Sequence, residues 1–391
     1  MAGKAELAEL LLAHWRHIES YPQQAARCFI GFDGFTDDIA VAVQQRVDAA
    51  TYCLFETIAP FTERLAQASG KSCNIELILQ RRKIGGNAPL LTCALLEGGH
   101  QITFAGTIGT EETIEPLFQP MAQRCAAVIP LAPSSHSHII EFRDGKIIFG
   151  NLTSLLTLTT EKIQSTFPIP AFSELLSHCS LIVNANWTMM PIMTPFWHYL
   201  IESVVPELPP LKAGPPRYLF VDLADPAKRS DRDLQEAMEA LRQLNQSFHV
   251  VLGINRSESE RLIALFTEGQ RMGMQNTKEE AVAMAEELRK VTGLDQIIIH
   301  SPMWAAAAAP AVSACVDSPY TPQPAVITGA GDNFNAGFCN ALLYGLDLTE
   351  RLLSGVATAG YYVRMAKSPT IAALAKFLLA WERDIHHLGE K

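Results

Sequence analysis

The chain has 391 residues, of which 48% are hydrophobic and 18% are charged. This length and composition support a large folded core and exclude a disordered acidic segment. The formal net charge is −10, which excludes a broad basic surface for nucleic acid or for an anionic membrane.

No apolar run reaches the 18 residues that a membrane-spanning helix needs, so we expect no membrane span. The sequence has eight cysteines, with neither a CxxC pair nor His/Cys spacing typical of a zinc site. Several of them lie within apolar runs. We therefore expect free thiols and a protein of the reducing cytoplasm.

In chain order, residues 4–20 come first and carry Leu7, Leu11 and Trp15 at helical spacing, which predicts an amphipathic docking helix. Short β-rich runs then alternate with helical patterns through the chain. Such alternation predicts a mostly parallel sheet with helices on both faces. The predicted strands are 28–32, 101–105, 181–184, 217–222, 249–252 and 296–300, followed by a hairpin over 305–309 and 312–316.

A second group of strands interrupts this pattern in the first 150 residues. It comprises residues 39–44, 75–81 and a hairpin over 138–149 that Asp144-Gly145 closes. We expect these strands to form a small antiparallel sheet, with a helix over 54–69 inserted in it. The predicted lid segments are about 38–50, 72–84 and 137–150.

The most specific motif is Gly329-Ala330-Gly331-Asp332, which begins a predicted helix. The two glycines allow close backbone approach to a ligand, and the first amides of a helix attract anions. The Asp332 carboxylate is then in a position to accept a proton from a hydroxyl that attacks phosphorus. The structural alternative is that Asp332 only caps the helix.

Two further segments stand between a strand and a helix. Gly85-Gly86-Asn87 combines flexible backbone with a side chain that both donates and accepts hydrogen bonds, although an ordinary turn has the same pattern. Asn255 and Glu258 open another helix, where Glu258 either balances the helix dipole or orients waters on a phosphate-bound metal.

Carboxylates also follow two of the predicted strands. Asp33, Asp37 and Asp38 come after the first strand, at the edge where ligands bind in open α/β sheets. They are candidates for binding sugar hydroxyls, and a solvated turn is the alternative. For Asp222 and Asp225, which end another strand, a loop-capping role is favoured over contact with Mg²⁺.

Together and in this order, the four segments resemble the ribokinase (PfkB) family of carbohydrate kinases over about residues 28–370. The resemblance implies a single ribokinase-like domain over 1–391: a three-layer α/β/α sandwich with a mostly parallel sheet and a small β lid. Asp332 would be the catalytic base, and Gly329, Ala330 and Gly331 the anion hole.

By the same resemblance, Asp37, Asp33 and the Gly85-Gly86-Asn87 turn would bind the sugar. Asn255 and Glu258 would be associated with phosphate and Mg²⁺, without a cluster of direct protein ligands. The implied partners are a sugar, ATP as phosphate donor, and a second copy of the chain that pairs through the lid.

Three positions depart from the family pattern, and two other functions stay open. Val326-Ile327 replaces the usual Asp-Thr, Leu90 replaces an Asn, and the segment 300–304 lacks the usual glycine. His300 is interpreted as structural. One alternative is a nucleoside kinase, with a shelf for the base made of Phe32, Phe35 and Phe142. The other is a sugar-binding regulator that has lost phosphoryl transfer.

Overall fold

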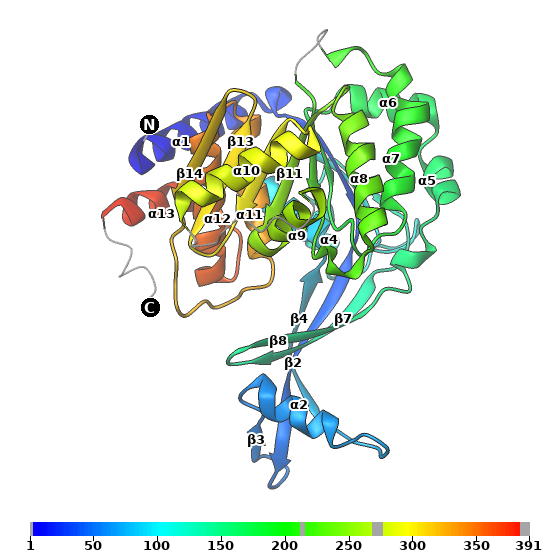
Figure 1. The fold of residues 1–391 in the computed structure, drawn as a ribbon, viewed down its shortest axis with the longest axis vertical. Coiled ribbons are helices and arrows are strands. Elements are labelled where there is room, and N and C mark those ends of the chain that lie inside the picture. The colour runs from blue at the N-terminus through cyan, green and yellow to red at the C-terminus, as the bar shows by residue number, and fades with distance from the viewer. Residues whose placement is uncertain (1–2, 212–215, 268–276, 384–391) are drawn as a thin grey trace.

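The structure is a computed structural model that describes residues 3–211, 216–267 and 277–383. Its centre is a sheet of nine strands among these residues, in the order β14-β13-β12-β11-β10-β9-β1-β5-β6 (Figure 1). Strand β13 is antiparallel to both of its neighbours, β12 and β14, and all the other neighbouring pairs are parallel. The strands are β1 (Arg27–Phe32), β5 (Gln101–Gly106), β6 (Ala127–Pro130), β9 (Leu181–Asn184), β10 (Tyr218–Asp222), β11 (His249–Asn255), β12 (Gln296–His300), β13 (Trp304–Ala309) and β14 (Val312–Asp317).

The central strands are continuous apolar runs because both faces of the sheet are covered. All four residues of β9 are buried, as are four of the five in β10 and in β12. Parallel strands of this kind lack the alternation of polar and apolar residues seen in half-exposed sheets.

Two helical layers cover the sheet, each with its own hydrophobic core. One layer packs against Ile30, Phe104 and Val183, and the other against Phe29, Ile182 and Leu219. The first layer comprises α1 (Lys4–Ser20), α3 (Asn87–Leu95), α4 (Gln119–Ala122), α11 (Ala330–Leu343), α12 (Leu348–Met365) and α13 (Ile371–Arg383). The second comprises α5 (Thr160–Thr166), α6 (Ile169–Ser177), α7 (Met193–Tyr199), α8 (Asp231–Leu244), α9 (Arg256–Phe266) and α10 (Lys278–Thr292). The predicted three-layer α/β/α architecture is confirmed.

Helix α1 has the bounds that the sequence predicts and packs along α13, so the two ends of the described chain lie side by side (Figure 1). Leu7 and Leu11 are fully buried in this contact layer. Within the described residues, no helix combines the length and apolar character that crossing a bilayer requires.

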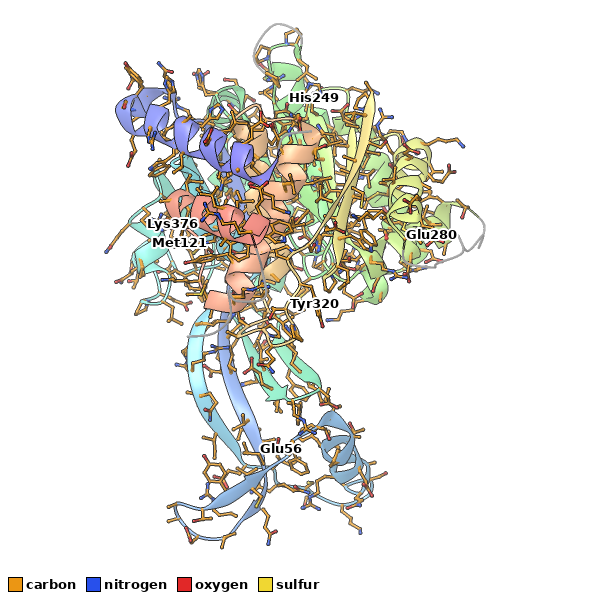
Figure 2. The ribbon with its side chains drawn as sticks, turned by 90° about the vertical axis from the view of Figure 1, so that its left-hand side faces the viewer. Glu56, Met121, His249, Glu280, Tyr320 and Lys376 are labelled. Atoms are coloured by element: carbon orange, nitrogen blue, oxygen red, sulfur yellow. The ribbon has the colours of Figure 1, made fainter. Side chains whose placement is uncertain are left out.

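The lid projects from one edge of the body, and in the view turned by 90° it still extends away, with Glu56 in its outer part (Figure 2). Its elements are β2 (Phe35–Arg46), β3 (Tyr52–Leu54), α2 (Ile58–Ala66), β4 (Leu77–Gly85), β7 (Ser135–Phe142) and β8 (Gly145–Asn151). The expectation of a wholly antiparallel sheet is wrong, because β2 and β7 run parallel. The reason is that β7 enters the lid from the body, as β2 does, after the long excursion through β5 and β6.

Candidate active site

A pocket of about 270 Å³ opens where parallel strands end beneath the root of the lid. Strands β10, β11 and β12 each contribute their last residue to its wall. The N-termini of α3, α9 and α11 face the same space, as the fold rule for open α/β sheets predicts. The lining residues are Gly86, Asn87, Leu90, Lys146, Asp222, Ala224, Asn255, Glu258, His300, Ile327, Thr328, Gly329, Gly331 and Asp332.

The start of α11 forms one wall of the pocket. Gly329 caps the helix at φ +97°, and a side chain there would have its Cβ 2.7 Å from the Tyr362 hydroxyl. Gly329 and Gly331 line the pocket, but Ala330 does not, and its N–H donates to the carbonyl of Ile327 at 3.1 Å. The structure therefore separates Ala330 from the other two residues of the predicted anion hole.

Asp332 is buried in the first turn of α11, and no side-chain cap closes that helix. Its Oδ1 accepts a hydrogen bond from Asn87 Nδ2 at 2.9 Å, which joins two motifs 245 residues apart. Burial, followed by the charges of Asp222 and Asp33, raises the pKa of Asp332 well above its usual value. A carboxylate in this setting binds a proton more readily than an exposed one does.

Asp33 holds the start of α3 in place. Its carboxylate accepts from the N–H groups of Asn87 at 2.9 Å and Ala88 at 2.8 Å, and from Asn186 Nδ2 at 2.7 Å. Gly86 adopts φ +91°, and a Cβ on it would lie 3.1 Å from the Asp33 carboxylate. Burial raises the pKa of Asp33 to about 6. Asp33 does not line the pocket, so it orients Asn87 from behind.

Asp37 does not line the pocket and lies on strand β2 of the lid. Gly85 on β4 leaves room for it, because a Cβ at Gly85 would lie 2.3 Å from the Asp37 carboxylate. Lys83 pairs with Asp37 across the two strands, and its buried Nζ has no hydrogen-bond partner among the described residues. Burial lowers the pKa of Lys83, while the charges of Asp37 and Asp332 oppose that shift.

Asn255 and Glu258 form a reciprocal capping box at the start of α9. Glu258 accepts from the Asn255 N–H at 2.9 Å and from its Nδ2 at 2.5 Å, and Asn255 Oδ1 accepts from the Glu258 N–H at 3.0 Å. Both side chains also line the pocket, together with Asp222. Burial and then repulsion from Asp222 raise the pKa of Glu258, and burial raises that of Asp222.

The lid contributes Lys146, which spacing did not identify. It is the second residue of β8, and its Nζ donates to the hydroxyl of Thr328, the residue before Gly329. Burial and the neighbouring Lys83 lower the pKa of Lys146. The lid hairpin thereby places a cation at the mouth of the pocket.

His300, which is interpreted from the sequence as structural, lines the pocket at the end of β12. Its ring centroid lies 4.9 Å from that of Phe334, and burial lowers its pKa to about 4. The side chain is therefore a neutral imidazole at neutral pH. A lone His at a strand end carries no sequence pattern that distinguishes a core residue from a pocket residue.

Most of the predicted site residues converge on the pocket, but the aromatic shelf does not form. Gly86, Asn87, Asn255, Glu258 and the residues 329, 331 and 332 line the pocket. Phe32 and Phe35 are buried in the main core instead, and Phe142 packs in the lid cluster with Phe61. These rings pack in hydrophobic clusters because they lie on the covered faces of their strands.

The chain is similar in sequence and in fold to known sugar kinases. A model of the prokaryotic ketohexokinase family matches residues 15–381. The ketohexokinase of Haloferax volcanii is 28% identical over 366 residues, which cover 92% of this chain and 93% of that protein. The ribokinase of Cryptococcus neoformans in complex with ADP has a TM-score of 0.60 at 16% identity, over 90% of this chain and 99% of its own. For the ribokinase of Thermotoga maritima the values are 0.59 and 14%, over 91% and 99%. The chain therefore belongs to the prokaryotic ketohexokinase family and is a carbohydrate kinase with the ribokinase fold.

Proposed function

We propose that this protein transfers the γ-phosphoryl group of ATP to a primary hydroxyl of a ketohexose. Family membership supports the acceptor class, since the related Haloferax volcanii protein is a ketohexokinase. The observation that carries the mechanism is the 2.9 Å hydrogen bond from Asn87 to Asp332. In this bond the amide of Asn87, a group that can bind sugar hydroxyls, meets the buried carboxylate of Asp332 at the start of α11.

In the proposed reaction, Asp332 accepts the proton of the sugar hydroxyl as the oxygen attacks the γ-phosphorus. The bond between that phosphorus and the bridging oxygen of ADP breaks as the new bond forms, and ADP leaves. A raised pKa suits Asp332 to this role, because a general base works best when its pKa approaches the working pH.

The acceptor sugar is proposed to lie between Asn87 and Asp37. Asn87 is oriented by Asp33 and Asp332, and Asp37 faces the unpartnered amine of Lys83. Burial raises the pKa of Asp37, and the charge of Lys83 opposes that shift and so favours the charged carboxylate. A charged acceptor binds hydroxyl groups more strongly than a neutral one.

The phosphoryl group is proposed to rest on the start of α11, where Gly329 and Gly331 present backbone to the pocket. The first N–H groups of a helix have no partner within it, and the helix dipole adds positive potential there. Lys146 comes down from the lid onto the same segment. These groups would stabilise the charge that spreads over the phosphoryl oxygens in the transition state.

The acidic wall of the pocket fits a divalent cation. Asp222 and Glu258 are hard oxygen donors, and each has a pKa raised by burial, to which repulsion from Asp222 adds at Glu258. We propose that these two side chains, with Asn255, hold Mg²⁺ through its waters. Bound there, Mg²⁺ neutralises charge on the phosphates.

We also propose a homodimer through the lid. The edge strands β4 and β8 carry the exposed apolar side chains of Leu77, Leu79, Ile148 and Phe149. Exposed edge strands with apolar side chains pair readily with another chain. Light scattering after gel filtration tests this proposal, and replacing Leu79 and Phe149 by Ser should yield monomers.

The acceptor proposal is tested by an assay coupled to ADP release, with ketohexoses, aldohexoses, ribose and nucleosides as acceptors. We expect the highest kcat/KM with a ketohexose, and NMR of the product should show phosphate on a primary hydroxyl. A higher kcat/KM with a nucleoside would overturn the proposal in favour of the nucleoside kinase alternative.

A further inference from the structure

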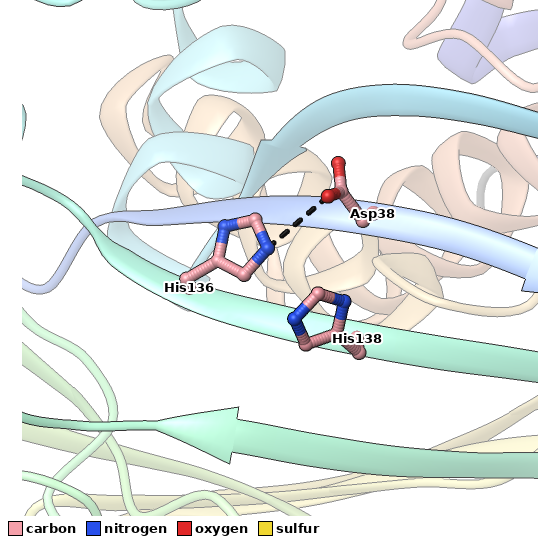
Figure 3. A group of neighbouring side chains, drawn as sticks. All are labelled: Asp38, His136 and His138. Carbon is pink, nitrogen blue, oxygen red and sulfur yellow. Dashed lines mark ion pairs between the residues drawn. The ribbon is translucent and has the colours of Figure 1, made fainter. Parts of the chain in front are cut away.

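Three potential metal ligands gather on one face of the lid, on strands β2 and β7. They are Asp38, His136 and His138, and one ligand atom from each lies within 4.8 Å of the other two (Figure 3). His136 Nε2 lies 3.2 Å from Asp38 Oδ2, and the two imidazole centroids are 4.5 Å apart. No role in the proposed sugar or phosphate binding uses these side chains.

The strand register explains why the three side chains meet. His136 and His138 are two residues apart on β7, so they point to the same face, and His138 pairs with Asp38 across the parallel strands. Asp37 and Ser137 alternate with them and point to the opposite face of these strands, the face of the proposed sugar site. None of the three cluster residues lines the catalytic pocket.

We propose that Asp38, His136 and His138 form a binding site for a borderline divalent cation of the Zn²⁺, Ni²⁺ or Co²⁺ type. Two imidazoles and one carboxylate are a donor set that suits these ions, and water completes the coordination. Donor atoms bound to one tetrahedral Zn²⁺ are about 3.3 Å apart, given metal–ligand distances of about 2.0–2.2 Å. The three side chains reach that spacing by small rotations, because His138 is exposed and His136 is partly exposed.

Arg82 is the competitor of the proposed ion. Its Nε and Nη2 donate to the two Asp38 oxygens at 2.5 and 2.8 Å, and hold the pKa of Asp38 below its usual value. The Arg82 side chain is 53% exposed, so it can turn into solvent when a metal neutralises Asp38. The remaining neighbours across β8 are uncharged: Asn151 pairs with His136, and Phe149 pairs with His138.

The test is a calorimetric titration of the metal-free full-length protein with Zn²⁺, in millimolar Mg²⁺ that occupies the hard-oxygen groups of the catalytic pocket. We expect one Zn²⁺ per chain, with an affinity that falls by about tenfold or more in His136→Asn and in His138→Asn. Arg82→Gln should instead tighten binding, because it frees the Asp38 carboxylate. Visible absorption of the Co²⁺ complex should show four-coordinate geometry and be lost in both His variants.

Two controls separate this site from general surface binding. His178→Asn removes an exposed His that follows the last residue of α6 and pairs with Glu174, and the double variant His386→Asn/His387→Asn removes the adjacent His pair near the end of the sequence. Neither should change the affinity for Zn²⁺. If the His136 and His138 variants bind Zn²⁺ as the unmodified protein does, and only lose thermal stability, the cluster is an ion-pair network and the proposal is wrong.

Discussion

Replacing Asp332 by Asn separates its proposed chemical role from a structural one. The substitution keeps the size of the side chain, and the new amide oxygen can still accept the hydrogen bond that Asn87 donates at 2.9 Å. What it removes is the negative charge and the ability to take up a proton. Phosphoryl transfer should therefore slow while the fold is retained.

The size of the effect follows from general base catalysis. Losing a positioned base costs roughly 10²–10⁴-fold in kcat, which corresponds to about 3–5 kcal/mol in the activation barrier. The effect on stability has the opposite sign. Asp332 is buried beside the carboxylates of Asp222 and Asp33, which raise its pKa, so a neutral Asn should increase the free energy of unfolding at neutral pH.

The assay measures kcat and KM with a ketohexose and ATP, together with urea unfolding of each variant. Asp347→Ala is the matched control, because Asp347 caps α12 through the N–H of Glu350 at 2.8 Å and does not line the pocket. It should lose about 1 kcal/mol of stability with kcat unchanged. A folded Asp332→Asn variant with normal kcat would refute the assignment of the base, and a variant that loses stability in parallel with activity would point to a structural role.

Three further substitutions test the lid at Gly85, the lid cation Lys146 and the buried His100. Gly85→Ala should raise the KM for sugar about 10- to 100-fold, since its Cβ displaces Asp37 and a charged hydrogen bond contributes about 1.5–3 kcal/mol. Lys146→Met should lower kcat by a similar factor, with partial recovery in Lys146→Arg, if this cation contacts the transferred group. Burial lowers the pKa of His100 to about 4 from 6.5, so its contribution to stability is present above pH 6.5 and is lost as the pH falls toward 4. In urea unfolding, His100→Gln should lose about 3 kcal/mol less than the unmodified protein between pH 7 and pH 4.

Each of these predictions has a control or a contrary outcome. Gly150→Ala is the match for Gly85→Ala in the lid, because its Cβ meets nothing nearer than 3.6 Å, and it should leave the KM unchanged. Lys290→Met removes an exposed lysine on α10 and should leave kcat unchanged. Equal pH dependence of stability in His100→Gln and the unmodified protein would show that His100 does not carry the acid sensitivity.

The lid shows where local sequence patterns stop being sufficient. Alternation and the Asp144-Gly145 turn predict strands, and β7 and β8 do form a hairpin there. Alternation does not say which strands become neighbours, since a strand can pair in either direction. The parallel pairing of β2 with β7 depends on both strands leaving the body at the same edge, and this pairing creates the Asp38, His136 and His138 cluster.

The sequence by itself determined the order of strands and helices, the three-layer architecture and the motifs at helix starts, because hydrophobic period, glycines and helix-start residues are local signals. Only the tertiary structure decided which polar groups share the pocket. Lys146 and His300 come from separate elements, and nothing in their spacing marks them as pocket residues. Their burial, and with it the shift in each pKa, arises when the lid, β12 and α11 enclose one space.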